Sequence, residues 1–255
     1  MAQAFESGQG RIVALRRFLF GDRRASKLAL ALVSLDLVFV VVHGVKYAFK
    51  EETIELFGYW LYRNLTITND WAIPEVTNYL KFVVIVFLLI RTFALVRQPV
   101  YLAWAFVYAV ALMDDSLQIH EGLGAVISAW LGDVTLFGAE LQADSGFRVQ
   151  DLGELIVYGL YGVTFAGVLA LGFLWSGTRH RVIGLGFGLL LGGLAFFVAA
   201  VDMVDRLVAA HSGTLAGVLA TLEDGGEMIV ISLTVAFALI VYRSEAARLR
   251  DQPVF

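Results

Sequence analysis

The sequence contains no cysteine and has little charge. Because none of the 255 residues is a cysteine, disulfide bonds, thiolate metal sites and cysteine nucleophiles are excluded. Only 16% of the residues are charged, against about a quarter in a soluble domain. No run of basic residues resembles a nucleic-acid-binding surface. The remaining composition, 59% hydrophobic with a mean hydropathy of +0.76, indicates a chain that buries its apolar surface in lipid.

Six apolar segments are long enough to cross a bilayer, which takes roughly 20 residues per helix. We therefore predict an all-α fold, a polytopic membrane helix bundle of about six transmembrane helices. The fifth segment is long and rich in glycine, so it could be split or tilted, and its small residues allow close helix packing. The six segments are Leu28–Phe49, Pro74–Val96, Val100–Leu123, Gly153–Trp175, Val182–Ala210 and Leu215–Tyr242.

Basic residues are unevenly distributed about these segments. If the segments alternate in direction, 13 of the 19 Lys and Arg residues fall on the side of the two termini. The positive-inside rule then predicts both termini in the cytoplasm of a bacterial-type inner membrane. The first segment is too long for a signal peptide and lacks a small-residue cleavage site, so we expect it to remain as a helix. The expected organisation is a basic tail at 1–27, a transmembrane domain at 28–243 and a cytoplasmic tail at 244–255.

The two long connections, 50–73 and 124–152, are predicted to lie on the outer side. Each mixes aromatic residues and leucines with acids, a composition typical of helices that lie in the membrane interface. We expect a short interfacial helix in each connection rather than a soluble domain.

Acidic residues gather where the apolar segments meet the outer side. If the third segment continues as one helix, Asp114, Gln118 and Glu121 share a stripe, and Asp115 and His120 flank it. The fourth helix starts with Asp151 and Glu154, and Tyr158 and Tyr161 continue their stripe. The fifth helix ends with Asp202 and Asp205 beside Arg206, and the sixth starts with Glu223, Asp224 and Glu227. In the first helix, Asp36 and His43 share a face.

Ionisable residues within membrane spans are costly and usually functional. So many carboxylates at one depth require protonation or a cation, and carboxylate ligands with an imidazole suit Zn, Fe, Mn or Ca. The bundle resembles di-iron carboxylate proteins in architecture alone, because the Glu-x-x-His motif is absent. The predicted divalent-metal ligands are Asp114, Asp115, His120, Glu121, Glu154, Asp202, Asp205, Glu223 and Glu227, with His43, Asp36, Asp151, Asp224 and Tyr158 as additional candidates.

Three functions are compatible with this pattern. The first is a metal-dependent membrane enzyme, a hydrolase or oxidoreductase acting on a lipid-like substrate. The second is a proton- or cation-coupled transporter, which the few polar residues of the inner half disfavour. The third is an accessory subunit of a larger membrane complex, or a homo-oligomer.

Some of the candidate residues also have plain structural interpretations. Asp151, Glu223 and Asp224 could be helix caps, Asp202 and Asp205 could pair with Arg206, and Asp36 and His43 could simply hydrogen-bond helices together. We expect His180, between Arg179 and Arg181, to lie in a solvated turn.

Overall fold

The chain is described here by a computed structural model that places residues 22–131, 149–201, 203–204, 208 and 212–251. Within these residues all regular structure is helical. The elements are α2 (Arg23–Ala48), α3 (Lys50–Asn64), α4 (Ile73–Val96), α5 (Pro99–Leu117), α6 (Ile119–Leu131), α8 (Val149–Leu174), α9 (Thr178–Ala195), the π-helical turn η2 (Phe196–Val201) and α11 (Gly213–Arg250). Six helical spans are long and apolar enough to cross a membrane, which agrees with the predicted all-α fold of about six spans.

Local sequence explains where several of these helices begin and end. The carboxylate of Asp22 accepts hydrogen bonds from the backbone N–H groups of Arg24 and Ala25 and so caps α2. Helix α4 ends where Arg97 adopts a left-handed conformation, and Pro99 then opens α5 two residues later. A proline in the first turn costs no helical hydrogen bond, so the turn between the two helices is short.

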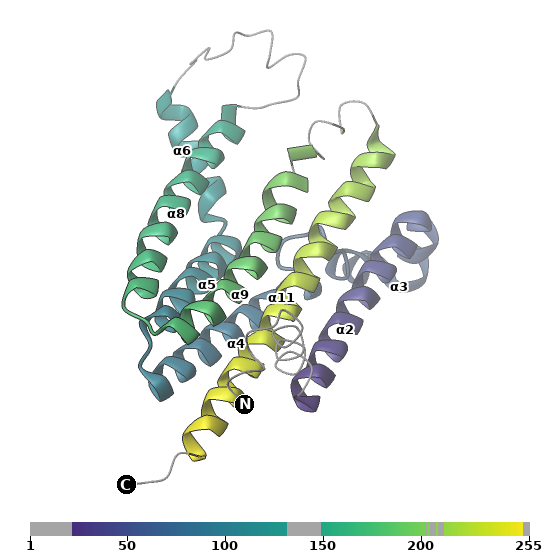
Figure 1. Ribbon diagram of the computed structural model, residues 1–255. Coiled ribbons are helices and arrows are strands. Elements are labelled where there is room, and N and C mark those ends of the chain that lie inside the picture. Colours follow the sequence, from purple (N-terminus) through teal and green to yellow (C-terminus); the bar gives the residue numbers. More distant parts are fainter. Residues whose placement is uncertain (1–21, 132–148, 202, 205–207, 209–211, 252–255) are drawn as a thin grey trace.

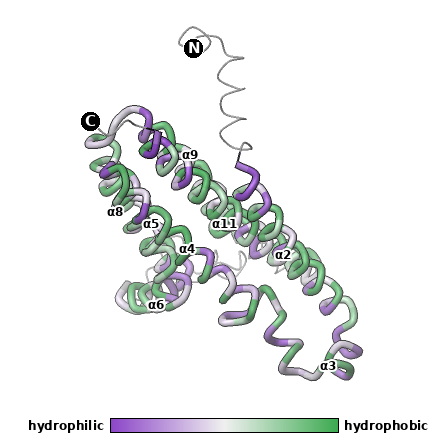
Figure 2. Tube along the Cα trace, turned by 90° about the horizontal axis from the view of Figure 1, so that it is seen from below, coloured by the Kyte–Doolittle hydropathy of each residue, from purple (hydrophilic) through white to green (hydrophobic). Residues whose placement is uncertain are grey.

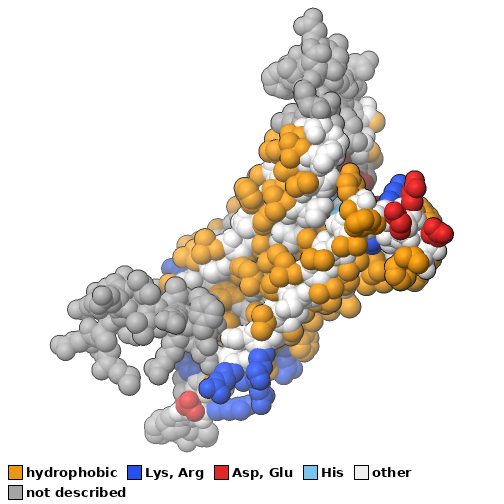
Figure 3. Space-filling view, turned by 90° about the vertical axis from the view of Figure 1, so that its right-hand side faces the viewer, with side chains coloured by type: hydrophobic (Ala, Val, Ile, Leu, Met, Phe, Trp, Pro, Cys, Tyr) orange, Lys and Arg blue, Asp and Glu red, His pale blue; other side chains and the backbone are white. Residues whose placement is uncertain are grey.

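The helices pack as two groups, one around α11 and one around α5, and α4 belongs to both (Figure 1). Helix α11 lies against α2, α4 and α9, whereas α5 lies against α4 and α8, and α6 covers the outer half of α8. The start of α2, the end of α11 and the α4–α5 and α8–α9 turns lie at one end of the bundle. The same end of the face formed by α2 and α11 carries Lys and Arg side chains, and a broad apolar surface lies beyond them (Figure 3).

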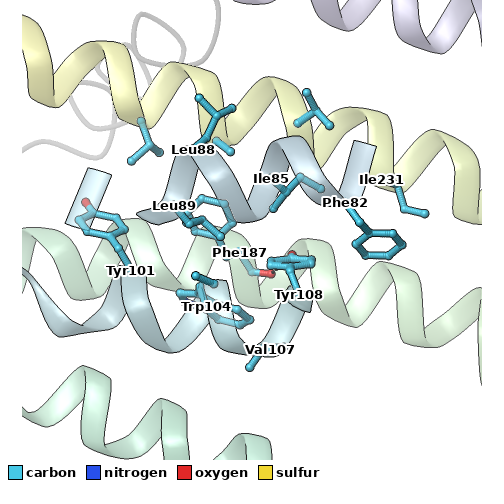
Figure 4. Close-up of a cluster of buried hydrophobic side chains, with 14 of the residues drawn as sticks. Phe82, Ile85, Leu88, Leu89, Tyr101, Trp104, Val107, Tyr108, Phe187 and Ile231 are labelled. Atoms are coloured by element: carbon cyan, nitrogen blue, oxygen red, sulfur yellow. Dashed lines mark hydrogen bonds between the residues drawn. The ribbon is translucent and has the colours of Figure 1, made fainter. Parts of the chain in front are cut away.

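Large aromatic side chains fill the centre of the bundle, between α4, α5, α9 and α11 (Figure 4). Trp104 and Tyr108 of α5 lie against Phe187 of α9, with ring centroids 6.0 and 6.4 Å apart, and all three are almost fully buried. Leucine, valine and phenylalanine side chains are exposed along the outside of the same helices, as expected for helices surrounded by lipid.

Helix α3 lies in the first long connection and extends away from the bundle (Figure 2). None of its residues is buried, and its exposed surface carries Leu56, Phe57 and Trp60 next to three glutamates. Gly58, with φ +79°, bends the helix in a conformation that other residues rarely adopt. The predicted helix is therefore present in this connection, and its location in the membrane interface stays a prediction.

The predicted third helix is wrong at its outer end. Instead of continuing to Leu123, α5 ends at Leu117, because Gln118 adopts a left-handed conformation with φ 52° and ψ 43°. Helix α6 then starts at Ile119 in a new direction, so Asp114, Gln118 and Glu121 do not form one stripe. The glycine-rich fifth span is regular up to Ala195 and continues as η2, which agrees with the expected irregularity there.

Candidate functional site

The reversal at Gln118 folds His120 back over the end of α5. The carboxylate of Asp114 accepts two hydrogen bonds from His120, one from the backbone N–H to Oδ1 and one at ring Nδ1 to Oδ2, both 2.9 Å long. A carboxylate that holds Nδ1 fixes the tautomer of a neutral imidazole and leaves Nε2 as the free nitrogen lone pair. The turn between α5 and α6 therefore presents one oriented histidine.

Helix α8 completes the surroundings of this pair. The hydroxyl of Tyr161 donates a third hydrogen bond to Asp114, at 2.9 Å from Oδ1. The ring of Tyr158 stacks on the His120 imidazole, with centroids 5.2 Å apart and planes inclined by 27°. Asp114 is 8% exposed, so nearly all of its hydrogen bonding is to protein. The site is thus built from the end of α5, the start of α6 and the middle of α8.

The outer end of α4 adds further acids. The negative charges of Glu75, Asp114 and Asp70 all act on Asp115, and the charge of Glu75 has the largest effect of the three. Glu75 accepts a hydrogen bond from the backbone N–H of Trp71, and Asp70 accepts one from the Gln118 amide at 2.6 Å. The residues from 70 to 75 are therefore tied to the same turn that presents His120.

The pKa of His120 is set by two opposing effects. Burial by itself lowers the pKa, because it disfavours the charged imidazolium. The hydrogen bond and negative charge of Asp114, together with the charges of Glu121 and Glu154, act in the opposite direction and raise the pKa above its usual value. His120 therefore carries positive charge over more of the pH range than a free histidine does.

A close approach of α6 and α8 brings the first acids of α8 to this region. A Cβ on Gly153 would lie 2.1 Å from the carbonyl oxygen of Gly124, so both helices need glycine here. Asp151 and Glu154 are consequently buried, at 5% and 6% exposure, and the Gln150 amide donates to Glu154 at 2.9 Å. Glu121, in contrast, lies on the exposed side of α6.

The acids of the sixth span lie elsewhere. Glu223, Asp224 and Glu227 are half-buried on α11, which packs on α2, α4 and α9, and Figures 1 and 2 show α6 and α8 on the other side of the bundle. Asp202 and Asp205 fall outside the described residues. Among the residues that the structure places, no three His, Asp or Glu side chains converge as a metal-binding group.

Asp36 and His43 share a face of α2 but contact different partners. Asp36 forms a buried ion pair with Lys81 of α4, 2.5 Å between Nζ and Oδ1, and accepts a hydrogen bond from Ser232 of α11. His43 accepts from the backbone N–H of Ile67 at 3.4 Å. Asp36 therefore joins three helices, in agreement with its structural interpretation, whereas His43 holds the connection between α3 and α4 to α2.

His180 is buried rather than solvated, so that prediction is wrong. It lies in the first turn of α9, where its Nδ1 is 2.9 Å from the Tyr101 hydroxyl and 3.8 Å from the carboxylate of Glu245. Arg179 pairs with the same carboxylate at 2.9 Å, and Glu245 is 1% exposed. The end of the bundle opposite to the His120 turn thus contains a polar cluster that joins α5, α9 and α11.

Sequence reasoning missed two residues of the outer site, Asp70 and Glu75, and placed Gln118 within a continuous helix instead of at its end. A signal for Asp70 and Glu75 was present, because the second span starts at the same outer level as the fourth and sixth. Gln118 carried no such signal, since a glutamine within an apolar helical pattern gives no indication of a left-handed turn.

No curated protein and no solved structure matches the chain. A family model matches residues 71–241, which include α4 to α11 up to Val241 and therefore every part of the outer site from Trp71 onward. Because this match covers more than half of the sequence, the chain belongs to the family described as Domain of unknown function (DUF8692).

Proposed function

We propose that this multi-pass membrane protein binds a divalent cation at its outer face, with Nε2 of His120 as a ligand. The observation that carries the proposal is the double hydrogen bond between Asp114 and His120. Histidines that ligate metals almost always donate their other ring N–H to a carboxylate or carbonyl, which orients the ring and raises its basicity. Asp114 is in that position, so its role would be to orient His120.

Carboxylates of the neighbouring helices would complete the coordination by moving toward His120, because no three such side chains converge among the described residues. The charge of Glu75 acts on Asp115, and the charges of Glu121 and Glu154 act on His120. A divalent cation would relieve the mutual repulsion of these acids, which are otherwise costly to hold together at the end of a membrane span. Imidazole with carboxylate ligands suits Zn, Mn or Fe(II).

The surroundings of the site favour a substrate that reaches it from the membrane. Met113, Leu117 and Leu123 stand beside it with 51%, 62% and 47% of their surface exposed. An amphiphile whose polar head lies at the lipid–water boundary could place that head next to His120. A bound cation would lower the pKa of a coordinated water, and a carboxylate outside the coordination shell would accept its proton, which is the chemistry of metal-assisted hydrolysis.

The distribution of positive charge supports an orientation with both termini in the cytoplasm. Arg23, Arg24, Arg97, Arg181 and Arg248 lie at the end opposite to His120, and the positive-inside rule assigns that end to the cytoplasm. The site then faces the periplasm of an inner membrane. Helix α3, with its exposed aromatic residues, would lie in the outer interface.

Metal binding by purified protein tests the proposal. Protein in lipid nanodiscs is equilibrated with Zn²⁺, Mn²⁺ or, without oxygen, Fe²⁺ in turn, and bound metal is measured by elemental analysis. We expect stoichiometric binding of at least one ion and its loss in His120→Ala. In Asp114→Asn we expect affinity to fall about 10- to 100-fold, as is typical when the partner of a ligating histidine is changed.

His43→Ala is the matched control, because it removes a buried histidine of another site. Its metal content should equal that of the unmodified protein. Equal metal content in His120→Ala and the unmodified protein, or no binding of any of the three ions, would show that the outer site is not a metal centre. Affinity should also weaken as the pH falls through the raised pKa of His120, because the metal then competes with a proton.

A further inference from the structure

Oxygen atoms from three helices surround the ammonium group of Lys81 in the interior of the bundle. Its Nζ lies 2.5 Å from Oδ1 of Asp36 on α2, 3.0 Å from Oδ1 of Asn78 on α4 and 3.5 Å from the carbonyl oxygen of Met228 on α11. The second carboxylate oxygen of Asp36 accepts a hydrogen bond of 2.5 Å from Ser232. Each of the three ammonium protons therefore has an oxygen acceptor.

All of these groups are removed from solvent. Asp36 and Ser232 are 0% exposed, Lys81 is 4% exposed and Asn78 is 8% exposed. A lysine and an aspartate inside a membrane span are expensive unless each has a partner. A carboxylate, an amide carbonyl and a backbone carbonyl that point to one position form the kind of oxygen shell that holds a small cation.

The two charges come from different parts of the sequence. Lys81, Asn78, Met228 and Ser232 lie within residues 71–241, which match the family model, whereas Asp36 precedes them on α2. Helix α2 otherwise meets α11 through the apolar cluster of Phe39 and Met228 and through the pairing of Asp22, at its start, with Arg243. The carboxylate of α2 thus completes an oxygen shell whose other members belong to the family region.

We propose that Asp36, Asn78 and the Met228 carbonyl form a monovalent-cation site in the middle of the bundle. The tethered ammonium of Lys81 fills this site, and the site holds α2 on α4 and α11. This site is separate from the outer one, and its ligands are of a different class. It accepts a compact cation with hydrogen-bond donors or a weak hydration shell.

Chemical rescue tests the site. Lys81→Ala removes the tethered ammonium and leaves the oxygen shell with a net negative charge, so the variant should unfold at a lower temperature than the unmodified protein. Ammonium, methylammonium, Na⁺ or K⁺ is then added as the chloride at constant ionic strength. We expect at least one of them to raise the unfolding temperature of Lys81→Ala saturably, and to leave that of the unmodified protein unchanged.

Two variants separate binding in the shell from general salt effects. Lys81→Ala/Asp36→Asn lacks the negative charge, so no cation should stabilise it. Lys46→Ala truncates another buried lysine, which donates to Tyr62 and Thr66 and forms no ion pair with a carboxylate in the part of the chain that the structure describes, so it should not be rescued. Rescue by amines alone identifies an ammonium-type site, and equal rescue by Na⁺ or K⁺ identifies an alkali-ion site. No rescue by any of the four cations, or equal rescue of the double variant, would overturn the proposal.

A disulfide measurement covers the case in which Lys81→Ala cannot be purified. The chain has no cysteine, and a Cβ on Gly225 of α11 would lie 2.8 Å from a methyl group of Val40 on α2, so Val40→Cys/Gly225→Cys reports the docking of α2. In membranes, Asp36→Asn should slow oxidation of this pair several-fold. An unchanged rate would show that α2 is not held through the site.

Discussion

Replacing Asp114 with alanine removes the acceptor of three hydrogen bonds that together define the turn between α5 and α6. The donors are the backbone N–H and ring Nδ1 of His120 and the hydroxyl of Tyr161, each 2.9 Å from a carboxylate oxygen. A hydrogen bond contributes about 1 kcal/mol net, more when one partner is charged, and a buried donor left unpaired costs about 1–3 kcal/mol. Relief of repulsion with Asp115 offsets part of this. We expect Asp114→Ala to lower the free energy of unfolding by about 3 kcal/mol.

Reversible unfolding in mixed micelles measures this free energy. Tyr161→Phe removes one of the three donors and should cost about 1 kcal/mol. Asp70→Ala removes a single exposed acceptor of Gln118 and should stay within about 0.5 kcal/mol of the unmodified protein. If Asp114→Ala costs no more than Tyr161→Phe, the carboxylate does not hold the turn.

The pH dependence of the stability lost in Asp114→Ala is a second test of the Asp114–His120 ion pair. The pKa of His120 is raised in the folded protein, so the Asp114–His120 ion pair stabilises the fold fully below the unfolded histidine pKa of about 6.5. This contribution is lost as the pH rises through the higher folded pKa of His120. The cost of Asp114→Ala should therefore be larger at pH 5 than at pH 9, and a cost that is larger at pH 9 would refute the assignment.

Two further predictions concern helix packing and capping. Gly153→Ala would place a methyl group 2.1 Å from the Gly124 carbonyl oxygen and should lower the free energy of unfolding by about 2 kcal/mol. Gly159→Ala on the same helix meets nothing within 4 Å and should raise the free energy of unfolding by about 0.5 kcal/mol. Equal effects of the two substitutions would disprove the close contact of α6 and α8. Asp22→Ala removes the cap of α2 and should cost about 1 kcal/mol at pH 7. Burial raises the pKa of Asp22, but the hydrogen bonds to Ala25, Arg243 and Arg24 have a larger combined effect and lower it below its usual value. The cap therefore stabilises the fold fully above the unfolded pKa of about 3.9, and this contribution is lost as the pH falls through the lower folded pKa. A pH series that compares the stability of Asp22→Ala with that of the unmodified protein would detect the loss.

The sequence by itself determined the six-helix membrane bundle. Apolar runs of the length of a bilayer leave few alternatives, because unpaired backbone groups cannot stand in hydrocarbon and helices satisfy their own hydrogen bonds. The alternation of these spans placed Asp114, His120 and Glu154 near helix ends, as the structure has them, although His120 begins α6 instead of ending the third span.

Tertiary structure alone decided which of these residues meet. The left-handed turn at Gln118 is accompanied by a contact with Asp70, 48 residues away, and by the acceptors that Asp114 offers to His120. The first contact is not local, and the second forms only because the helix has already ended at Leu117. The pairing of Asp36 with Lys81 likewise depends on the rotation of α2 and α4 about their own axes. Helix order gives the depth of a side chain in the membrane, but the neighbours of that side chain depend on which helix faces pack together. Many apolar faces are nearly equivalent, so small differences in packing free energy decide which faces meet.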